Sequence, residues 1–170
     1  WTALGRYAGD EEYLSYVMDI LEHPVFQSME RYIQHGQTTC RDHCIRVSYL
    51  TYRICRRMGW NSRESARAGL LHDLFLYDWH THGKMTGERF HGFTHPRTAM
   101  NNAEKYFEVT EDQKNMILRH MWPLTPIPPA TKEGMALCLA DKACSLAEVG
   151  DGIRENQWVC RLAHVLHGAG

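Results

Sequence analysis

The stretch GLLHDLFLYDWH, residues 69–80, places two polar side chains where an apolar helix would otherwise continue. It begins as an apolar helical segment and then sets His72 and Asp73 side by side. Burying a lone carboxylate costs several kcal/mol unless the carboxylate is paired or ligates a metal. The pair therefore predicts a buried partner elsewhere in the chain.

The sequence around this stretch has helical periodicity almost throughout, with capping residues at the expected helix starts. Asp10, Thr110 and Thr131 are predicted N-caps, Thr38 or Thr39 opens the longest helix, and Pro96 starts a later one. No strand alternation of useful length and no internal repeat occurs, so we expect an all-α fold, a compact helical bundle. The predicted helices are 11–23, 24–34, 40–59, 64–74, 97–107, 111–121, 132–150 and 153–167.

Two segments interrupt the helical pattern, 77–95 with three glycines and 121–131 with four prolines, and both are predicted to be loops. Loops of this length in a compact domain are usually functional or disordered. In the longest helix, the apolar positions expected to face the core are Ile45, Val47, Leu50, Ile54 and Met58.

Composition places the chain among soluble globular proteins. Its 170 residues are expected to form one domain, and 44% of them are hydrophobic and 23% charged. The net charge of −1 argues against a nucleic-acid partner and against a basic membrane-binding patch. No apolar run reaches the ~18 residues of a membrane span, and nothing resembles a signal peptide. The six cysteines form no CxxC, so we expect a reducing, cytoplasmic location.

Cys40 and Cys44 are one helical turn apart, a spacing that suits either a metal clip or two small buried side chains. We favour burial. Histidine is the unusual residue, with eleven in the chain.

Several of these histidines, together with two aspartates, break helix faces that are otherwise apolar. A single such histidine is more often a hydrogen-bonded core residue than a ligand, but a set distributed over five helices requires a common partner. A metal ion provides one, because neutral imidazoles and carboxylates can donate lone pairs to the same cation. The candidate ligands are His43, His72, Asp73, His95, His120 and Asp141.

This ordered set resembles the HD-domain superfamily of metal-dependent phosphohydrolases over residues 38–148. The matching motifs are DHCIRV, GLLHDL, THPRTA, RHMWP and LADKA. The resemblance implies an HD-type core with flanking helices at both ends. It also implies one metal held by His43, His72, Asp73 and Asp141, and a second held by His95 and His120 with Asp73 as the bridge. Both extra histidines are typical of the two-metal branch, which includes HD-GYP phosphodiesterases and symmetrical dinucleoside tetraphosphate hydrolases.

The subfamily patterns are not matched. HD-GYP proteins carry a lysine three residues after the His-Asp pair, where this chain has Leu76, and their GYP loop is missing here. The (p)ppGpp hydrolases place Glu-Asp shortly after the pair, and residues 74–77 contain neither. Single-metal nucleotidases have a glutamate at the position of Leu76, and their later aspartate corresponds to Asp78.

The expected chemistry follows from the ligands. Two metals can share a water, lower its pKa and direct the resulting hydroxide at phosphorus, with Asp73 as the shared catalytic ligand. Four histidines and two aspartates suit transition metals better than magnesium. We expect two divalent ions, iron first, with Mn, Co, Ni and Zn as alternatives.

The substrate is expected to be a small phosphorylated molecule, such as a nucleotide, and a homodimer is an open alternative to a monomer. The predicted phosphate-binding cations are Lys84, Arg97, Arg46 and Lys142, although each one alone is more typical of a solvated surface charge. Proton donors are sought among His80, His82 and His91, and Trp79, Phe90, Phe93 and Trp122 suit either base stacking or core packing.

Three functions therefore remain open. The first is a phosphohydrolase that cleaves a phosphate ester or anhydride. The second is an HD-type mixed-valent di-iron oxygenase acting on a small organic substrate, which uses the same six ligands. The third is a non-catalytic, metal-bound sensor module.

Overall fold

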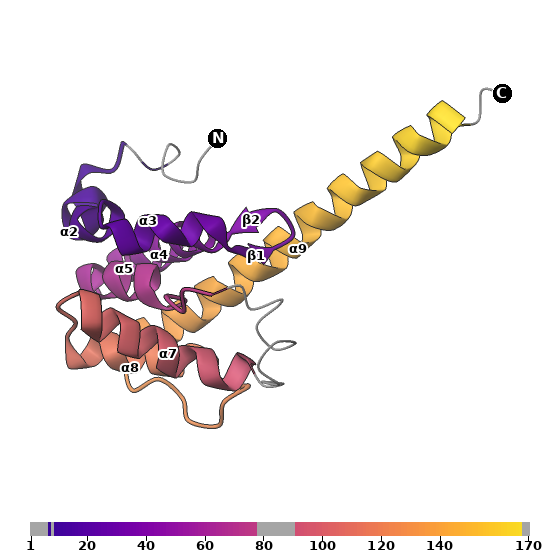
Figure 1. Ribbon diagram of the computed structural model, residues 1–170. Helices are drawn as coiled ribbons and strands as arrows, with labels where there is room; N and C mark the ends of the chain where they lie inside the picture. Colours follow the sequence, from indigo (N-terminus) through magenta and orange to yellow (C-terminus); the bar gives the residue numbers. More distant parts are fainter. Residues whose placement is uncertain (1–6, 8, 78–90, 168–170) are drawn as a thin grey trace.

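A computed structural model describes residues 7, 9–77 and 91–167, and over these residues the protein is built almost entirely of α-helices. The all-α prediction is confirmed. Figure 1 shows the helices gathered in one body, from which the C-terminal part of the last helix extends. The elements are α2 (Glu11–Leu21), α3 (Pro24–Ser28), the 3-10 turn η1 (Met29–Arg31), β1 (Ile33–His35), β2 (Thr38–Thr39), α4 (Cys40–Met58), α5 (Ser62–Leu71), α7 (His91–Tyr106), α8 (Glu111–Arg119) and α9 (Lys132–His167).

Local capping residues set most helix starts. The Asp10 side chain accepts a hydrogen bond from the backbone N–H of Tyr13 at the start of α2, and Thr39 caps α4 in the same way. Thr110 and Gln113 form a reciprocal capping box at α8. These interactions satisfy backbone donors that a helix leaves free at its N-terminus, so a short sequence signal is sufficient to place them.

The predicted helix 24–34 is wrong in its second half. Helix α3 ends at Ser28, the 3-10 turn η1 follows it, and the chain then forms the small antiparallel hairpin of β1 and β2. Gly36 makes the turn with a φ of 58°, a left-handed conformation that favours glycine. The hairpin places the side chain of Gln34 in the interior, where it is buried.

Two other predicted boundaries are also wrong. Helix α7 begins at His91, so residues 91–95 are helical and Pro96 lies inside the helix, while residues 78–90 of the predicted loop lie outside the described residues. Pro96 is near the start of α7, so the hydrogen bond that it forfeits is one of the first in the helix. Helix α9 runs without a break from Lys132 to His167, because Gly150 lowers helix propensity without forbidding the helix.

The buried face of α4 differs from its predicted apolar stripe. Leu50 and Met58 are 36% and 56% exposed, although Ile45 and Val47 are buried as expected. Small and hydroxyl-bearing residues fill most of the remaining interior face, because α4 packs closely against both α5 and α9. The buried residues of α4 are Cys40, His43, Cys44, Ile45, Val47, Ser48, Thr51, Tyr52 and Cys55.

Gly69 allows the close approach of α4 and α5. A Cβ at this position would lie 2.6 Å from the Cα of Ser48, which is backbone and cannot rotate away. We expect Gly69→Ala to destabilise the protein by about 1–3 kcal/mol through overpacking, and to lower the Tm by about 2–12 °C. Thermal unfolding followed by circular dichroism measures the change.

Gly150→Ala is the matched control for this substitution. A Cβ at Gly150 meets nothing within 4 Å, so alanine there should leave the Tm unchanged or raise it. An equal response from the two variants would contradict a special close contact at Gly69.

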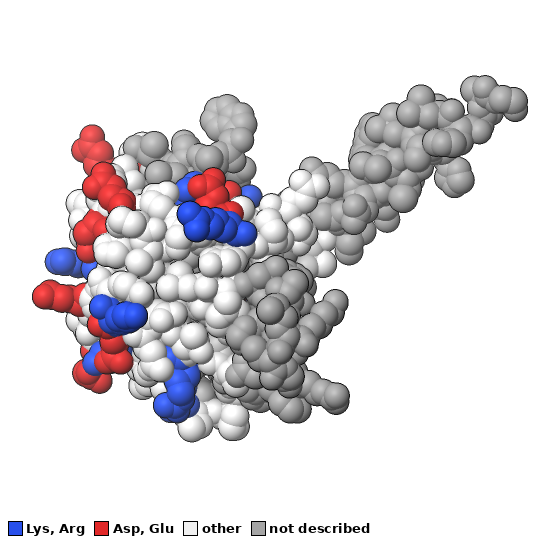
Figure 2. Space-filling view, in the orientation of Figure 1, with Lys and Arg blue, Asp and Glu red and all other residues white. Residues whose placement is uncertain are grey.

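The described surface carries charges of both signs. Figure 2 shows acidic and basic side chains interspersed on one face, without the continuous basic stripe that follows a nucleic-acid backbone. Among the described helices, none has both the length and the apolar character required to cross a membrane.

Candidate metal centre

The structure brings all six candidate ligands together in the interior of the bundle. Each of them is at most 8% exposed, although all are polar or ionisable. They are His43 in the first turn of α4, His72 at the end of α5, Asp73 directly after it, His95 on α7, His120 at the end of α8 and Asp141 on α9.

His72 and His120 occupy equivalent positions, the C-caps of α5 and α8. Each ring donates an Nδ1–H hydrogen bond to the carbonyl oxygen three residues earlier, Gly69 at 2.8 Å and Ile117 at 2.7 Å respectively. A carbonyl is only an acceptor, so Nδ1 carries the proton and the neutral ring has its bare lone pair on Nε2. In both rings the geometry therefore presents Nε2 to the cluster, as in metal-binding histidines whose other nitrogen is hydrogen-bonded.

The carboxylate of Asp73 lies between two pairs of histidines. Its Oδ1 is 3.2 Å from Nε2 of His95 and 3.5 Å from Nε2 of His120. Its Oδ2 is 3.8 Å from Nε2 of His43 and 3.4 Å from Nε2 of His72. Each oxygen thus faces one pair, which is the arrangement needed by a carboxylate shared between two cations.

Asp141 completes the half of the cluster around His43 and His72. Its Oδ1 lies 3.2 Å from Nε2 of His43 and 3.7 Å from Nε2 of His72. Ligand atoms of these three residues all lie within 4.8 Å of one another, as do those of His72, Asp73 and His120. Both groups are compact enough to hold an ion.

The electrostatics of the cluster are those of buried charges that need counterions. Burial favours the neutral form of His43, but hydrogen bonds with Asp141 and Glu148 outweigh this effect and raise its pKa to about 10. Burial and the neighbouring rings of His72 and His95 lower the pKa of His120 to about 3. Without an ion, protons on imidazoles balance the carboxylates.

The two aspartates are held ionised by the same imidazoles. Burial acts to raise the pKa of Asp73, yet His72, His95 and His120 hold it below its ordinary value. Burial likewise opposes ionisation of Asp141, but a hydrogen bond with His43 and the positive charge of His72 hold its pKa well below the usual range. Without an ion, the cluster is thus a set of anionic carboxylates stabilised by neighbouring imidazoles.

Unsatisfied buried atoms show that this donor set fits a metal. Nε2 of His72 and Oδ1 of Asp73 are buried and make no hydrogen bond. Nε2 of His95 and Nε2 of His120 lie only 3.0 Å apart, and the latter carries a bare lone pair in the neutral ring. The two atoms without a hydrogen bond, Nε2 of His72 and Oδ1 of Asp73, require an explanation. Cations held by these residues would satisfy both atoms.

Two buried residues that contact the candidate ligands were not anticipated from the sequence. Gln34 on β1 donates from Nε2 to Oδ2 of Asp73 at 2.6 Å, and Glu148 on α9 accepts from Nδ1 of His43 at 2.9 Å. Gln34 lies in a segment predicted to be helical, so no signal was available. Glu148 follows Asp141 by seven residues on the same helix, and this spacing is a signal that could have indicated a shared face.

The predicted substrate cations lie in different surroundings. Arg46 pairs with Glu148 at 3.4 Å, and Lys142 donates to the carbonyl oxygens of His120 at 3.3 Å and Cys138 at 3.4 Å. Arg97 is exposed on α7. These placements leave the predicted contacts with substrate untested.

Several predicted residues cannot be placed at the site. Lys84, Trp79, Phe90, His80 and His82 lie outside the described residues, and the side chains of His91 and Phe93 are likewise not described.

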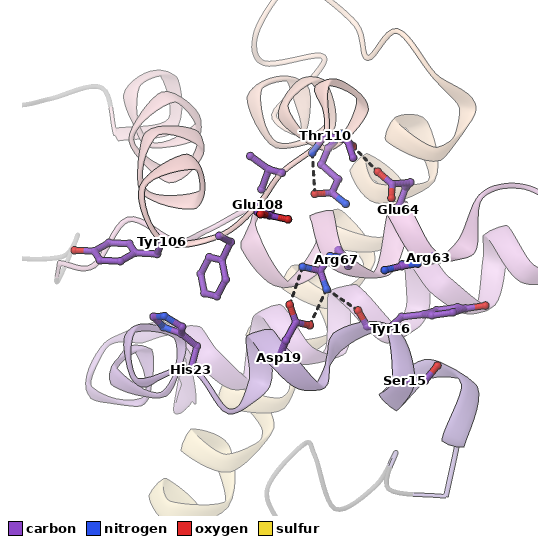
Figure 3. A pocket seen from close by; sticks show the side chains of 13 residues that line it. Ser15, Tyr16, Asp19, His23, Arg63, Glu64, Arg67, Tyr106, Glu108 and Thr110 are labelled. Atoms are coloured by element: carbon purple, nitrogen blue, oxygen red, sulfur yellow. Dashed lines mark hydrogen bonds and ion pairs between the residues drawn. The ribbon is translucent and has the colours of Figure 1, made fainter.

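A separate pocket of about 740 Å³ contains none of the six candidate ligands. In Figure 3, Arg67 donates to both carboxylate oxygens of Asp19, at 2.7 and 2.9 Å, and to the carbonyl oxygen of Tyr16. Glu64 accepts a hydrogen bond from the Thr110 hydroxyl. These polar groups of the wall satisfy one another, so the pocket shows no comparable requirement for a ligand.

Fold and site together define an all-α protein whose interior contains a candidate metal centre built from five helices. The family model of the HD domain matches residues 41–146, more than half of the chain, and the protein belongs to this family. A curated relative, "Putative phosphohydrolase YueE" of Bacillus subtilis (strain 168), is 34% identical over 74 residues, which are 44% of this chain. The match spans only 39% of that relative's length.

Proposed function

We propose that the protein is a metal-dependent phosphohydrolase that cleaves a phosphate ester or anhydride of a nucleotide or similar small molecule. The observation that carries the proposal is the position of Asp73, whose two oxygens face two separate histidine pairs. Membership of the HD family and the name of the bacterial relative support the same reaction class.

His43, His72, Asp73 and Asp141 would hold one divalent transition-metal ion, and His95 and His120 a second that shares Asp73. When bound, such ions supply an activated water and positive charge opposite the phosphoryl oxygens. The hydrogen bonds of His72 and His120 with backbone carbonyls keep Nε2 of each ring turned inward, and Gln34 orients Oδ2 of Asp73. No protein nucleophile is required in this scheme.

Metal analysis followed by a hydrolysis screen tests the proposal. Purified protein is assayed for metal content, stripped with chelator and reloaded with Fe(II) under anaerobic conditions, or with Mn, Co, Ni or Zn. Phosphate release is then followed on nucleoside mono-, di- and triphosphates, cyclic dinucleotides and dinucleoside polyphosphates. We expect about two ions per chain and hydrolysis that depends on them. Metal-loaded protein inactive on every phosphate compound would contradict the proposal, and oxygen consumption by the iron form would favour the oxygenase alternative.

Lys84 remains the proposed phosphate contact in the segment that follows the His-Asp pair. A charge-assisted hydrogen bond to phosphate contributes about 1.5–3 kcal/mol when desolvated. We therefore expect Lys84→Met to lower kcat/KM about ten- to a hundredfold without changing metal content. Steady-state kinetics on the best substrate of the screen measure the effect.

Lys105→Met, which removes an exposed lysine of α7, is the matched control and should retain the original kcat/KM. If Lys84→Met is equally active, phosphate is held by other cations, and Arg97 and Lys142 become the next residues to replace.

A further inference from the structure

Glu148 is a buried carboxylate whose position is explained by the ring of His43. Asp141 and Glu148 are seven residues apart on α9, two helical turns, and therefore lie on one face. The His43 ring lies between them, with Nε2 3.2 Å from Oδ1 of Asp141 and Nδ1 2.9 Å from Oε2 of Glu148. One helix thus contacts both nitrogens of the same imidazole.

Among the described residues, Glu148 has two polar partners, His43 and Arg46. Its side chain is only 1% exposed, and a carboxylate so far from water needs counterions. It accepts the hydrogen bond of His43 and pairs through Oε1 with Arg46 at 3.4 Å, and the Arg46 side chain is 33% exposed. Because the Arg46 contact is long and partly solvated, His43 is the principal partner.

The partner of Nδ1 differs among the histidines of the cluster. For His72 and His120 it is a neutral backbone carbonyl, whereas for His43 it is a full negative charge. A carboxylate on Nδ1–H fixes the tautomer, orients the ring and makes Nε2 a more basic ligand. Through Glu148, this effect acts on the half of the cluster that contains His43 and Asp141.

We infer that Glu148 is a positioning residue that strengthens His43 as a metal ligand and so raises the affinity of the His43–Asp141 half for its ion. The inference rests on the proposed metal centre, because Glu148 acts only through His43, one of the proposed ligands. Glu148 itself contacts neither the substrate nor the ions in this role. It explains why a carboxylate is buried at this point of α9.

Cobalt(II) binding tests this role independently of catalysis. Chelator-stripped protein is titrated with Co²⁺, following visible absorption and ion stoichiometry, for the original protein, Glu148→Ala and Glu148→Gln. We expect Glu148→Ala to weaken binding of one ion about ten- to a hundredfold and to leave the other unchanged. Glu148→Gln should lose less affinity, because the amide oxygen still accepts from Nδ1 but carries no charge. Glu22→Ala, at an exposed glutamate after α2, is the matched control and should bind both ions normally.

Two further measurements separate positioning from a general effect on folding. In the His120→Ala background, where one ion remains, Glu148→Ala should still weaken Co²⁺ binding. In the Co²⁺ form, NMR should detect the paramagnetically shifted Nδ1 proton of His43 in the original protein and in Glu148→Gln. In Glu148→Ala this proton has lost its acceptor, so it should exchange rapidly with water. If Glu148→Ala does not fold, the Co²⁺ affinity of Glu148→Gln decides.

Unchanged Co²⁺ affinity in the folded Glu148 variants would overturn the inference, as would an equal loss at both ions or an original protein that binds no Co²⁺. Failure of the proposed function gives a different result. In that case the protein binds two ions but releases no phosphate, and the comparison of Co²⁺ affinities still supports or overturns the role of Glu148.

Discussion

Asp73→Ala is expected to remove both metal ions and to lower hydrolysis to background, a loss of more than about a thousandfold. The reason is geometric, because one oxygen faces His95 and His120 while the other faces His43 and His72. Removing the carboxylate therefore takes a ligand from both halves of the cluster. Elemental analysis of the purified variant and phosphate release on the screened substrate measure the two effects.

Asp73→Asn separates charge from shape at this position, since the amide retains the volume but contributes no negative charge. It should also bind both ions poorly. Asp112→Asn changes an exposed acid in the first turn of α8 and should keep full metal content and activity. An Asp73→Ala protein that still holds one tightly bound ion would show that this carboxylate is not shared.

His120→Ala is expected to remove one ion and leave the other. Nε2 of His120 lies 3.5 Å from Oδ1 of Asp73 and 3.0 Å from Nε2 of His95, so its loss affects the half that contains His95. We expect about one ion per chain and a fall in kcat/KM of about a hundredfold or more, because charge neutralisation at phosphorus is then halved. Metal stoichiometry and steady-state kinetics provide the measurement.

His43→Ala is the reciprocal variant and should lose the ion of the opposite half, next to Asp141. The double variant should then bind neither ion. If His120→Ala retains both the stoichiometry and the activity of the original protein, the centre holds one ion in the His43–Asp141 half, and the two-metal mechanism is wrong.

The sequence by itself determined the features that depend on local interactions. Asp10, Thr39 and Thr110 act as caps as predicted, because a side chain that satisfies a backbone donor two or three residues away needs no tertiary contact. The six candidate ligands could be recognised for a related reason. A polar residue on an apolar helix face is visible in the sequence, and burying six of them favours a common partner.

Only the tertiary structure decided which surfaces are buried and which side chains meet. The interior face of α4 holds cysteine, serine and threonine instead of Leu50 and Met58, because close packing against α5 and α9 selects for small volume as well as for apolar character. The break expected near Gly150 and the start expected at Pro96 are also absent, since glycine and proline weaken a helix locally without fixing where it ends. Gln34 and Glu148 reach Asp73 and His43 across 39 and 105 residues of sequence. Contacts over such separations depend on how whole helices pack, and no pattern along a single helix contains that information.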